Sequence, residues 1–228
     1  MNSTPSPSDS RSSCRVVVLI SGSGSNLQSL IDGQQQQQLP ITIESVISNK
    51  PDAYGLQRAE AAGISNHVIS HKDYDGRESF DEALAKTIHQ YQPDLIVLAG
   101  FMRILTADFV RQFQGRMLNI HPSLLPKYQG LHTHQRALEA DDKQHGVTVH
   151  FVTEELDGGP PIIQAVVPVL NDDTPESLAK RVQTQEHIIY PMAVDWFATQ
   201  RLQLDKQQVL LDQSALPPQG YQVHSSKT

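Results

Sequence analysis

Residues Cys14–Ile31 read CRVVVLISGSGSNLQSLI, and this stretch decides the class of fold. Its first part, Cys14–Ile20, is a nearly continuous apolar run rich in β-branched residues, which is typical of a strand buried within a parallel sheet. A loop with two glycines follows at once, and apolar residues then recur at helical spacing over 27–31. The order of strand, glycine-rich loop and helix predicts an α/β fold with its site at the carboxyl ends of the strands.

The alternation of strands and helices continues along the chain. Apolar runs predict further strands at 41–48, 66–69, 93–100, 147–152 and 162–169, and helical spacing predicts helices at 54–62, 76–90 and 135–140. A last long helix should begin with Thr174 as its N-cap and Pro175 as its first residue, followed after Arg201 by a hairpin. Together these elements predict a Rossmann-like, mostly parallel sheet flanked by helices, formed by one domain over residues 14–228.

Composition limits the possible functions. The chain has 228 residues and a net charge of −7, which argues against a general nucleic-acid binder. Its apolar runs are too short to span a membrane, and its one cysteine, Cys14, fits a reducing compartment such as the cytoplasm. Residues 1–13 are rich in serine and proline and are expected to form a disordered tail. A transit peptide is the alternative, although the stretch is short and contains Asp9.

The first loop contains Gly22 and Gly24, which could begin a G-x-G-x-x-G dinucleotide-binding motif. The third glycine position holds Leu27, and Ser48-Asn49-Lys50 offers no acid for a ribose at the end of the next strand. A loop that opens a helix can still present backbone N–H groups to an anion. The residues alone therefore leave two interpretations open, a tight turn or a site for a single phosphate group.

A second stretch, MLNIHPSLLPKYQG at 117–130, places two polar residues at a strand end. Asn119 and His121 alternate with apolar residues, and Pro122 ends the strand. Side chains two residues apart on a strand point the same way, so this amide and imidazole could together stabilise an oxyanion. Taken alone, such residues more often cap a loop.

The segment N-I-H-P-S-L-L-P at 119–126 resembles the catalytic signature of the folate-dependent formyltransferase family. The similarity runs from Val16 to Tyr221 and is greatest to the members that act on 5-phosphoribosylglycinamide (GAR). It implies that the chain transfers the formyl group of 10-formyltetrahydrofolate to the amine of GAR in purine biosynthesis, without a metal. It also implies a catalytic aspartate in the motif E-L-D-G-G-P, which is Asp157 here.

The resemblance implies two sets of binding residues as well. The GAR set, which includes the phosphate loop, consists of Gly24, Ser25, Asn26, Gln183, Thr184, Gln185 and Glu186. The formyl-folate set consists of Arg77, Met102, Arg103, Ile104, Leu105, Thr153, Glu154, Glu155, Leu156 and Asp157. Two positions depart from the family pattern: Ser23, where asparagine is more common, and Pro161, where an aliphatic residue is more common.

In the implied mechanism, the Asn119 amide and a protonated His121 donate hydrogen bonds to the tetrahedral oxyanion. The Asp157 carboxylate favours the charged imidazole and can help to move the proton from the attacking to the leaving nitrogen. These three groups should therefore lie within a few ångströms of a common point, although they are far apart in sequence.

Three alternatives remain to be weighed. His132 and His134 invite a zinc hypothesis, but no cysteine or acid stands at ligand spacing, so loop histidines are expected. A methionyl-tRNA formyltransferase would typically need a further C-terminal domain, for which the residues after the last helix are expected to be too few. A non-catalytic phosphate-binding module is compatible with the glycine-rich loop, but not with three converging catalytic side chains.

Overall fold

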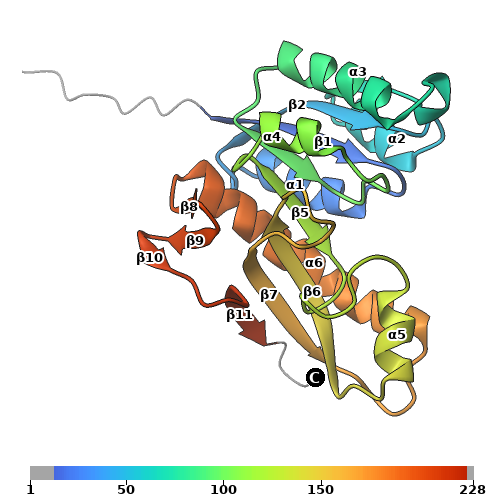
Figure 1. Cartoon of the computed structure of the whole chain (residues 1–228), viewed down its shortest axis with the longest axis vertical. Coiled ribbons are helices and arrows are strands. Elements are labelled where there is room, and N and C mark those ends of the chain that lie inside the picture. The colour runs from blue at the N-terminus through green and yellow to red at the C-terminus, as the bar shows by residue number, and fades with distance from the viewer. Residues whose placement is uncertain (1–12, 225–228) are drawn as a thin grey trace, which may run out of the picture.

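The computed structural model of the chain describes residues 13–224, in which a large sheet forms the central layer (Figure 1). Its strands are β1 (Cys14–Ile20), β2 (Ile41–Ser48), β3 (Ser65–Val68), β4 (Leu95–Leu98), β5 (Met117–His121), β6 (Gln144–Phe151), β7 (Pro161–Pro168) and β11 (Tyr221–His224). They follow the order β11-β7-β6-β5-β4-β1-β2-β3. Only β6 runs antiparallel to its neighbours β5 and β7, so the predicted mostly parallel sheet is confirmed.

Helices cover both faces of this sheet (Figure 1). They are α1 (Ser25–Gln35), α2 (Tyr54–Ala61), α3 (Arg77–Gln90), α4 (Ala107–Gln112), α5 (Thr133–Glu139) and α6 (Pro175–Ala198), with a short 3₁₀ turn η1 (His71–Asp73). A small second sheet contains β8 (Leu202–Asp205), β9 (Gln208–Leu211) and β10 (Ser214–Ala215). The predicted elements are present with ends that differ by a few residues, whereas η1, α4, β10 and β11 were not predicted. The predicted tail lies outside the described residues except for Ser13.

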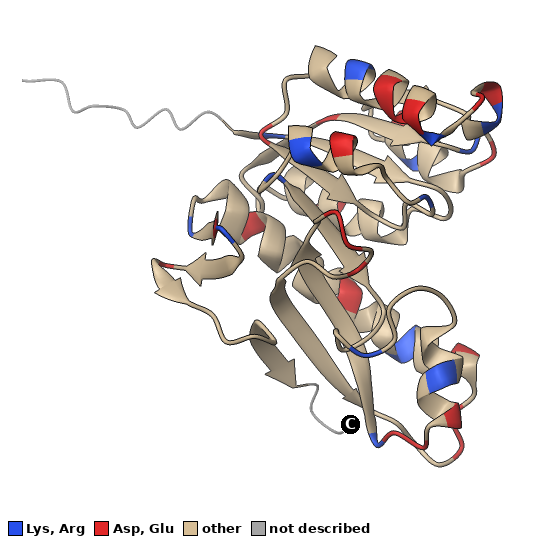
Figure 2. Cartoon of the chain, in the orientation of Figure 1, with Lys and Arg blue, Asp and Glu red and all other residues tan. Residues whose placement is uncertain are grey.

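The alternation of β1 shows how the core is divided. Val16 and Val18 pack into a cluster with residues of α1 and α6, whereas Val17 and Leu19 pack with residues of α3 and α4. Apolar side chains on both faces explain why this strand reads as a continuous apolar run. Lys, Arg, Asp and Glu gather on the helices and loops, and the central strands carry few of them (Figure 2). No helix within 13–224 has the length and apolar character to cross a membrane.

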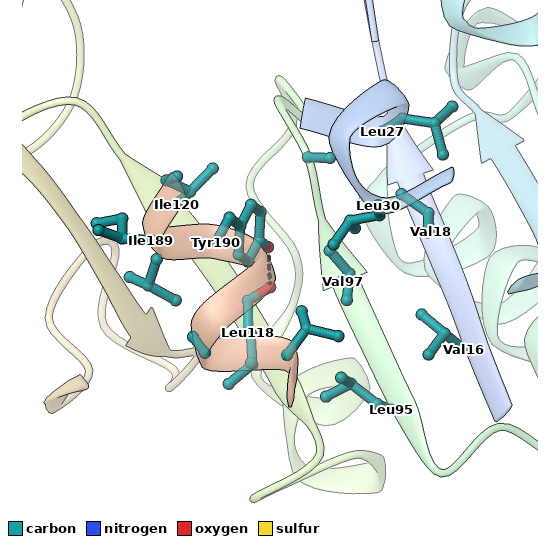
Figure 3. Packing of buried hydrophobic residues seen from close by; sticks show 14 of the residues in the cluster. Val16, Val18, Leu27, Leu30, Leu95, Val97, Leu118, Ile120, Ile189 and Tyr190 are labelled. Atoms are coloured by element: carbon teal, nitrogen blue, oxygen red, sulfur yellow. Dashed lines mark hydrogen bonds between the residues drawn. The ribbon is translucent and has the colours of Figure 1, made fainter. Parts of the chain in front are cut away.

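Helix α6 is fixed against the sheet by a buried tyrosine. Thr174 caps the helix, because its side chain accepts a hydrogen bond from Ser177 N and its own N–H donates to Ser177 Oγ. Further along, the Tyr190 hydroxyl lies 2.9 Å from Leu98 O, at the end of β4, and 3.0 Å from Leu118 O, near the start of β5; Figure 3 shows the second contact. The tyrosine thus links α6 directly to the residue that precedes Asn119.

Replacing Tyr190 by phenylalanine is expected to lower the free energy of unfolding by about 1–2 kcal/mol, because two buried carbonyl groups lose a donor. The measurement is urea denaturation followed by circular dichroism. The half-exposed Tyr221 provides the matched control, and Tyr221→Phe should change stability far less. Equal stability of Tyr190→Phe and the parent would show that this hydrogen bond contributes nothing net.

Candidate active site

Strand β5 carries Asn119 and His121 to the carboxyl edge of the parallel strands. The loop that follows His121 is held by a buried polar network centred on Thr148 of β6. The Thr148 hydroxyl donates to Ser123 O at 2.6 Å and accepts from Leu125 N at 3.1 Å. The chain therefore leaves β5 along a fixed path, and the two polar side chains keep fixed positions.

Asp157 reaches the same place from the loop between β6 and β7. Its Oδ2 lies 3.3 Å from His121 Nδ1 and accepts a hydrogen bond from Gly130 N at 3.0 Å. Its Oδ1 lies 3.4 Å from Asn119 Nδ2. The side chains of His121 and Asp157 are only 7% and 9% exposed. The structure thus brings together the three side chains that the sequence analysis named.

The hydrogen-bond partners of His121 restrict the form of its ring. His121 Nε2 lies 2.8 Å from Tyr128 O, and a carbonyl oxygen can only accept, so this nitrogen carries a hydrogen. The other nitrogen, Nδ1, faces the Asp157 carboxylate. An imidazolium, with a hydrogen on each nitrogen, satisfies both acceptors at once. Both ring nitrogens of His121 therefore face oxygen acceptors within the site.

Most of the predicted folate residues line one small cavity beside these groups, of about 90 Å³. Its lining includes Asn119, Arg103, Ile104, Leu105 and the loop Thr153–Asp157. Two predicted members lie elsewhere: Met102 is 62% exposed, and Arg77 is exposed at the start of α3. Burial raises the pKa of Asp81, and its hydrogen bonds from Thr106, followed by the positive charges of Arg103 and Arg77, oppose this rise.

The glycine-rich loop passes very close to α2. Gly24 has a left-handed backbone (φ +69°), and Gly22 O accepts a hydrogen bond from Gly55 N at 3.0 Å. A Cβ atom on Gly24 would lie 2.7 Å from the Cα atom of Gly55. Helix α1 then begins at Ser25 with neither a capping side chain nor an acid in its first turn. The start of α1 is therefore suited to an anion.

Helix α6 lies against the start of α1 and brings the other predicted GAR residues there. Asn26 Nδ2 donates to Glu186 Oε2 at 2.8 Å, and Gln183 Nε2 donates to Ser25 Oγ at 3.2 Å. Burial raises the pKa of Glu186, and the hydrogen bond from Asn26 opposes this rise. Gln185 is partly buried, whereas Thr184 is exposed and its hydroxyl bonds its own helix at Lys180 O.

A family model described as formyl transferase matches residues 14–194. The chain belongs to the formyl transferase family. It is 55% identical over 206 residues to the phosphoribosylglycinamide formyltransferase of Escherichia coli strain K12, which covers 90% of this chain and 97% of that protein. It is also 48% identical over 190 residues to the human trifunctional purine biosynthetic protein adenosine-3, covering 83% of this chain and 19% of the human protein.

Solved structures agree with this membership of the formyl transferase family. The phosphoribosylglycinamide formyltransferase of Coxiella burnetii superposes with a TM-score of 0.88 at 53% identity, covering 92% of this chain and 98% of that one. A glycinamide ribonucleotide transformylase from Symbiobacterium toebii gives a TM-score of 0.86 at 45% identity, covering 88% and 95% of the two chains. The fold class predicted from the sequence is confirmed.

Two features of this formyl transferase escaped the sequence analysis. His150 of β6 is buried opposite Asn119, with its Nε2 3.2 Å from Asn119 Nδ2. Ser21 is buried at the end of β1, where its hydroxyl donates to Asn49 Oδ1 and accepts from Met102 N at 2.8 Å. The alternation of residues 147–152 predicted the strand that carries His150. That His150 faces Asn119 depends on the register of β6 against β5, which the alternation does not give.

Proposed function

We propose that this chain transfers the formyl group of 10-formyltetrahydrofolate to the glycinamide amine of GAR, a step of purine biosynthesis in the cytoplasm. The observation that carries the proposal is the meeting of Asn119, His121 and Asp157 at one point. The relatives named phosphoribosylglycinamide formyltransferase support GAR as the acceptor. The lone Cys14 fits a reducing compartment.

Each of the three residues has a chemical role in this reaction. Attack of the neutral amine on the formyl carbon creates a negative charge on the formyl oxygen, and hydrogen-bond donors placed around that oxygen lower the barrier. The Asn119 amide and the imidazolium of His121 are the available donors. Asp157 stabilises the positive charge on His121 and can pass the proton released by the attacking nitrogen to the leaving nitrogen of the folate, whose bond to the formyl carbon breaks as the tetrahedral intermediate collapses.

The two substrates would enter from different sides of these residues. The phosphate of GAR would bind the start of α1, with Gln183 and Glu186 near its sugar and amine. The pterin of the folate would bind among Ile104, Leu105 and Leu156, which suit a flat apolar ring. The cavity there has about 90 Å³, below the roughly 300 Å³ of ordinary ligand pockets, so only part of the folate fits within it as it stands.

The test is an assay of the purified protein with GAR and 10-formyltetrahydrofolate, in which the absorbance of the deformylated folate is followed. Turnover that requires both substrates is expected. Formylmethionyl-tRNA formation should be absent when charged initiator tRNA replaces GAR. No turnover with GAR, or a preference for the tRNA, would refute the proposed acceptor.

Replacing Gly24 by valine is expected to weaken GAR binding by about 10- to 100-fold, because a β-branched residue is strained at this φ and collides with Gly55. Binding of a folate analogue should hardly change, since the folate residues lie on other loops. Isothermal titration calorimetry with GAR and with the folate analogue measures the two changes in affinity. Gly63→Val is the matched control, because Gly63 has the same φ of +69° but open space around it. Equal losses of both ligands in folded Gly24→Val would refute a phosphate site at this loop.

A further inference from the structure

Asn119 lies opposite His150 on the neighbouring strand, and the proposed mechanism gives His150 no role. Strands β5 and β6 pair so that Asn119 stands opposite His150, which is 2% exposed. His150 Nε2 lies 3.2 Å from Asn119 Nδ2. We propose that His150 is a positioning residue that fixes the orientation of the Asn119 carboxamide, an inference that rests on the formyl transfer proposed above.

The tautomer of His150 follows from its second contact. His150 Nδ1 lies 2.8 Å from Phe151 O, and because a carbonyl only accepts, Nδ1 carries the hydrogen. In a neutral ring, Nε2 is then an acceptor, and the contact with Asn119 is a hydrogen bond donated by the amide. Burial lowers the pKa of His150 to about 4, against the opposing effects of the Phe151 carbonyl and the Asp157 charge. The ring is therefore neutral at neutral pH.

This acceptor decides which way the carboxamide faces. The NH₂ group of Asn119 has two hydrogens, of which one is taken by His150 and the other points towards Asp157 Oδ1 at the longer distance of 3.4 Å. The second hydrogen thus lies in the space shared with His121 and Asp157, where an oxyanion would form. Without the acceptor, the amide could turn over and present its oxygen to that negative charge. His150 Nε2 also lies 3.9 Å from Asp157 Oδ1, which is beyond hydrogen-bond distance, so the proposed effect of His150 on the reaction passes through its hydrogen bond with Asn119.

Two substitutions of His150 separate this role from simple filling of the core. His150→Asn can keep the donor to Phe151 O but removes the acceptor for Asn119, whereas His150→Gln places an oxygen near the position of Nε2. His150→Asn is expected to lower kcat by about 10-fold, roughly the upper value of one hydrogen bond, with both KM values nearly unchanged. His150→Gln should retain most of kcat. Unchanged kcat in His150→Asn would overturn the proposal.

A double-mutant cycle with Asn119→Ala tests whether the effect passes through Asn119. In the Asn119→Ala background, His150→Asn should cost almost nothing further in kcat. An equal loss in both backgrounds would show that His150 acts independently, and it would overturn the proposal.

The tautomer of His150 can be measured in the parent protein, without a variant and without turnover. The ring ¹⁵N and ¹H correlations of His150 by NMR should show a neutral ring with its hydrogen on Nδ1 and none on Nε2. A hydrogen on Nε2 would exclude the acceptor role and overturn the proposal. If the parent protein did not formylate GAR, the function would fail while the assignment of the tautomer could still stand, so the two failures are distinguishable.

Discussion

Alanine in place of His121 is expected to lower kcat by about 100- to 1000-fold, the usual cost of losing one donor to an oxyanion. His121 is positioned by Tyr128 O on one side and Asp157 on the other, and it is largely shielded from water. Its charge therefore acts where water cannot screen it well. Because the imidazolium is needed mainly when the formyl oxygen becomes negative, the KM values for GAR and 10-formyltetrahydrofolate should change much less than kcat.

Steady-state kinetics with each substrate varied in turn measures this division. His89→Ala is the matched control, because His89 is an exposed histidine on α3 that lies outside the proposed site. Asn119→Ala should lose turnover in the same range as His121→Ala, since it removes the other donor. A His121→Ala protein that keeps kcat but binds GAR poorly would assign the histidine to substrate binding instead of catalysis.

The local sequence was sufficient to predict β1 and β5, whose carboxyl ends border the candidate site. The apolar run before Ser21 predicted β1 because both of its faces are buried, and Pro122 predicted the end of β5 because proline cannot continue the ladder. Helix α4, which Thr106 caps, was missed because its 6 residues are too few to show a helical period. Strand β11 was missed because its residues are mostly exposed, and its place beside β7 depends on pairing across the fold, with Tyr221 against Trp196.

The contacts within the site depend on topology that local patterns do not contain. Asp157 reads as a turn residue, and it is one, with a φ of +49°. Its carboxylate meets His121 only because β6 returns antiparallel beside β5 and brings its following loop to the same edge. The resemblance to a known family supplied the aspartate, but not His150, whose contact with Asn119 needs the register of β5 against β6. The sequence thus identified the reacting side chains, but it did not identify His150, which contacts one of them.

Asparagine in place of Asp157 is expected to lower kcat by at least about 100-fold while both substrates still bind, because the negative charge beside His121 is lost. The substitution is nearly isosteric, and asparagine tolerates the left-handed backbone at this position. Its single carbonyl oxygen can keep accepting from one side, Gly130 N or Asn119 Nδ2, but its NH₂ end cannot accept from the other. Kinetics and folate-analogue binding together measure this separation. Asp141→Asn is the matched control, since Asp141 is an exposed aspartate with a φ of +52° outside the site.

The protonation of His121 decides why turnover falls. In Asp157→Asn the negative charge that stabilises the imidazolium of His121 is absent. The Tyr128 carbonyl still accepts a hydrogen bond from Nε2–H of the ring. At neutral pH a smaller fraction of His121 should therefore be imidazolium in Asp157→Asn than in the parent, which the ring ¹⁵N shifts report directly. If the fraction is unchanged or larger although kcat has fallen, Asp157 does not act by stabilising that charge. The loss would then come either from proton transfer out of the attacking amine or from the lost acceptor for Gly130 N or Asn119 Nδ2. A small exogenous carboxylate or amine base should restore part of the activity only in the first case.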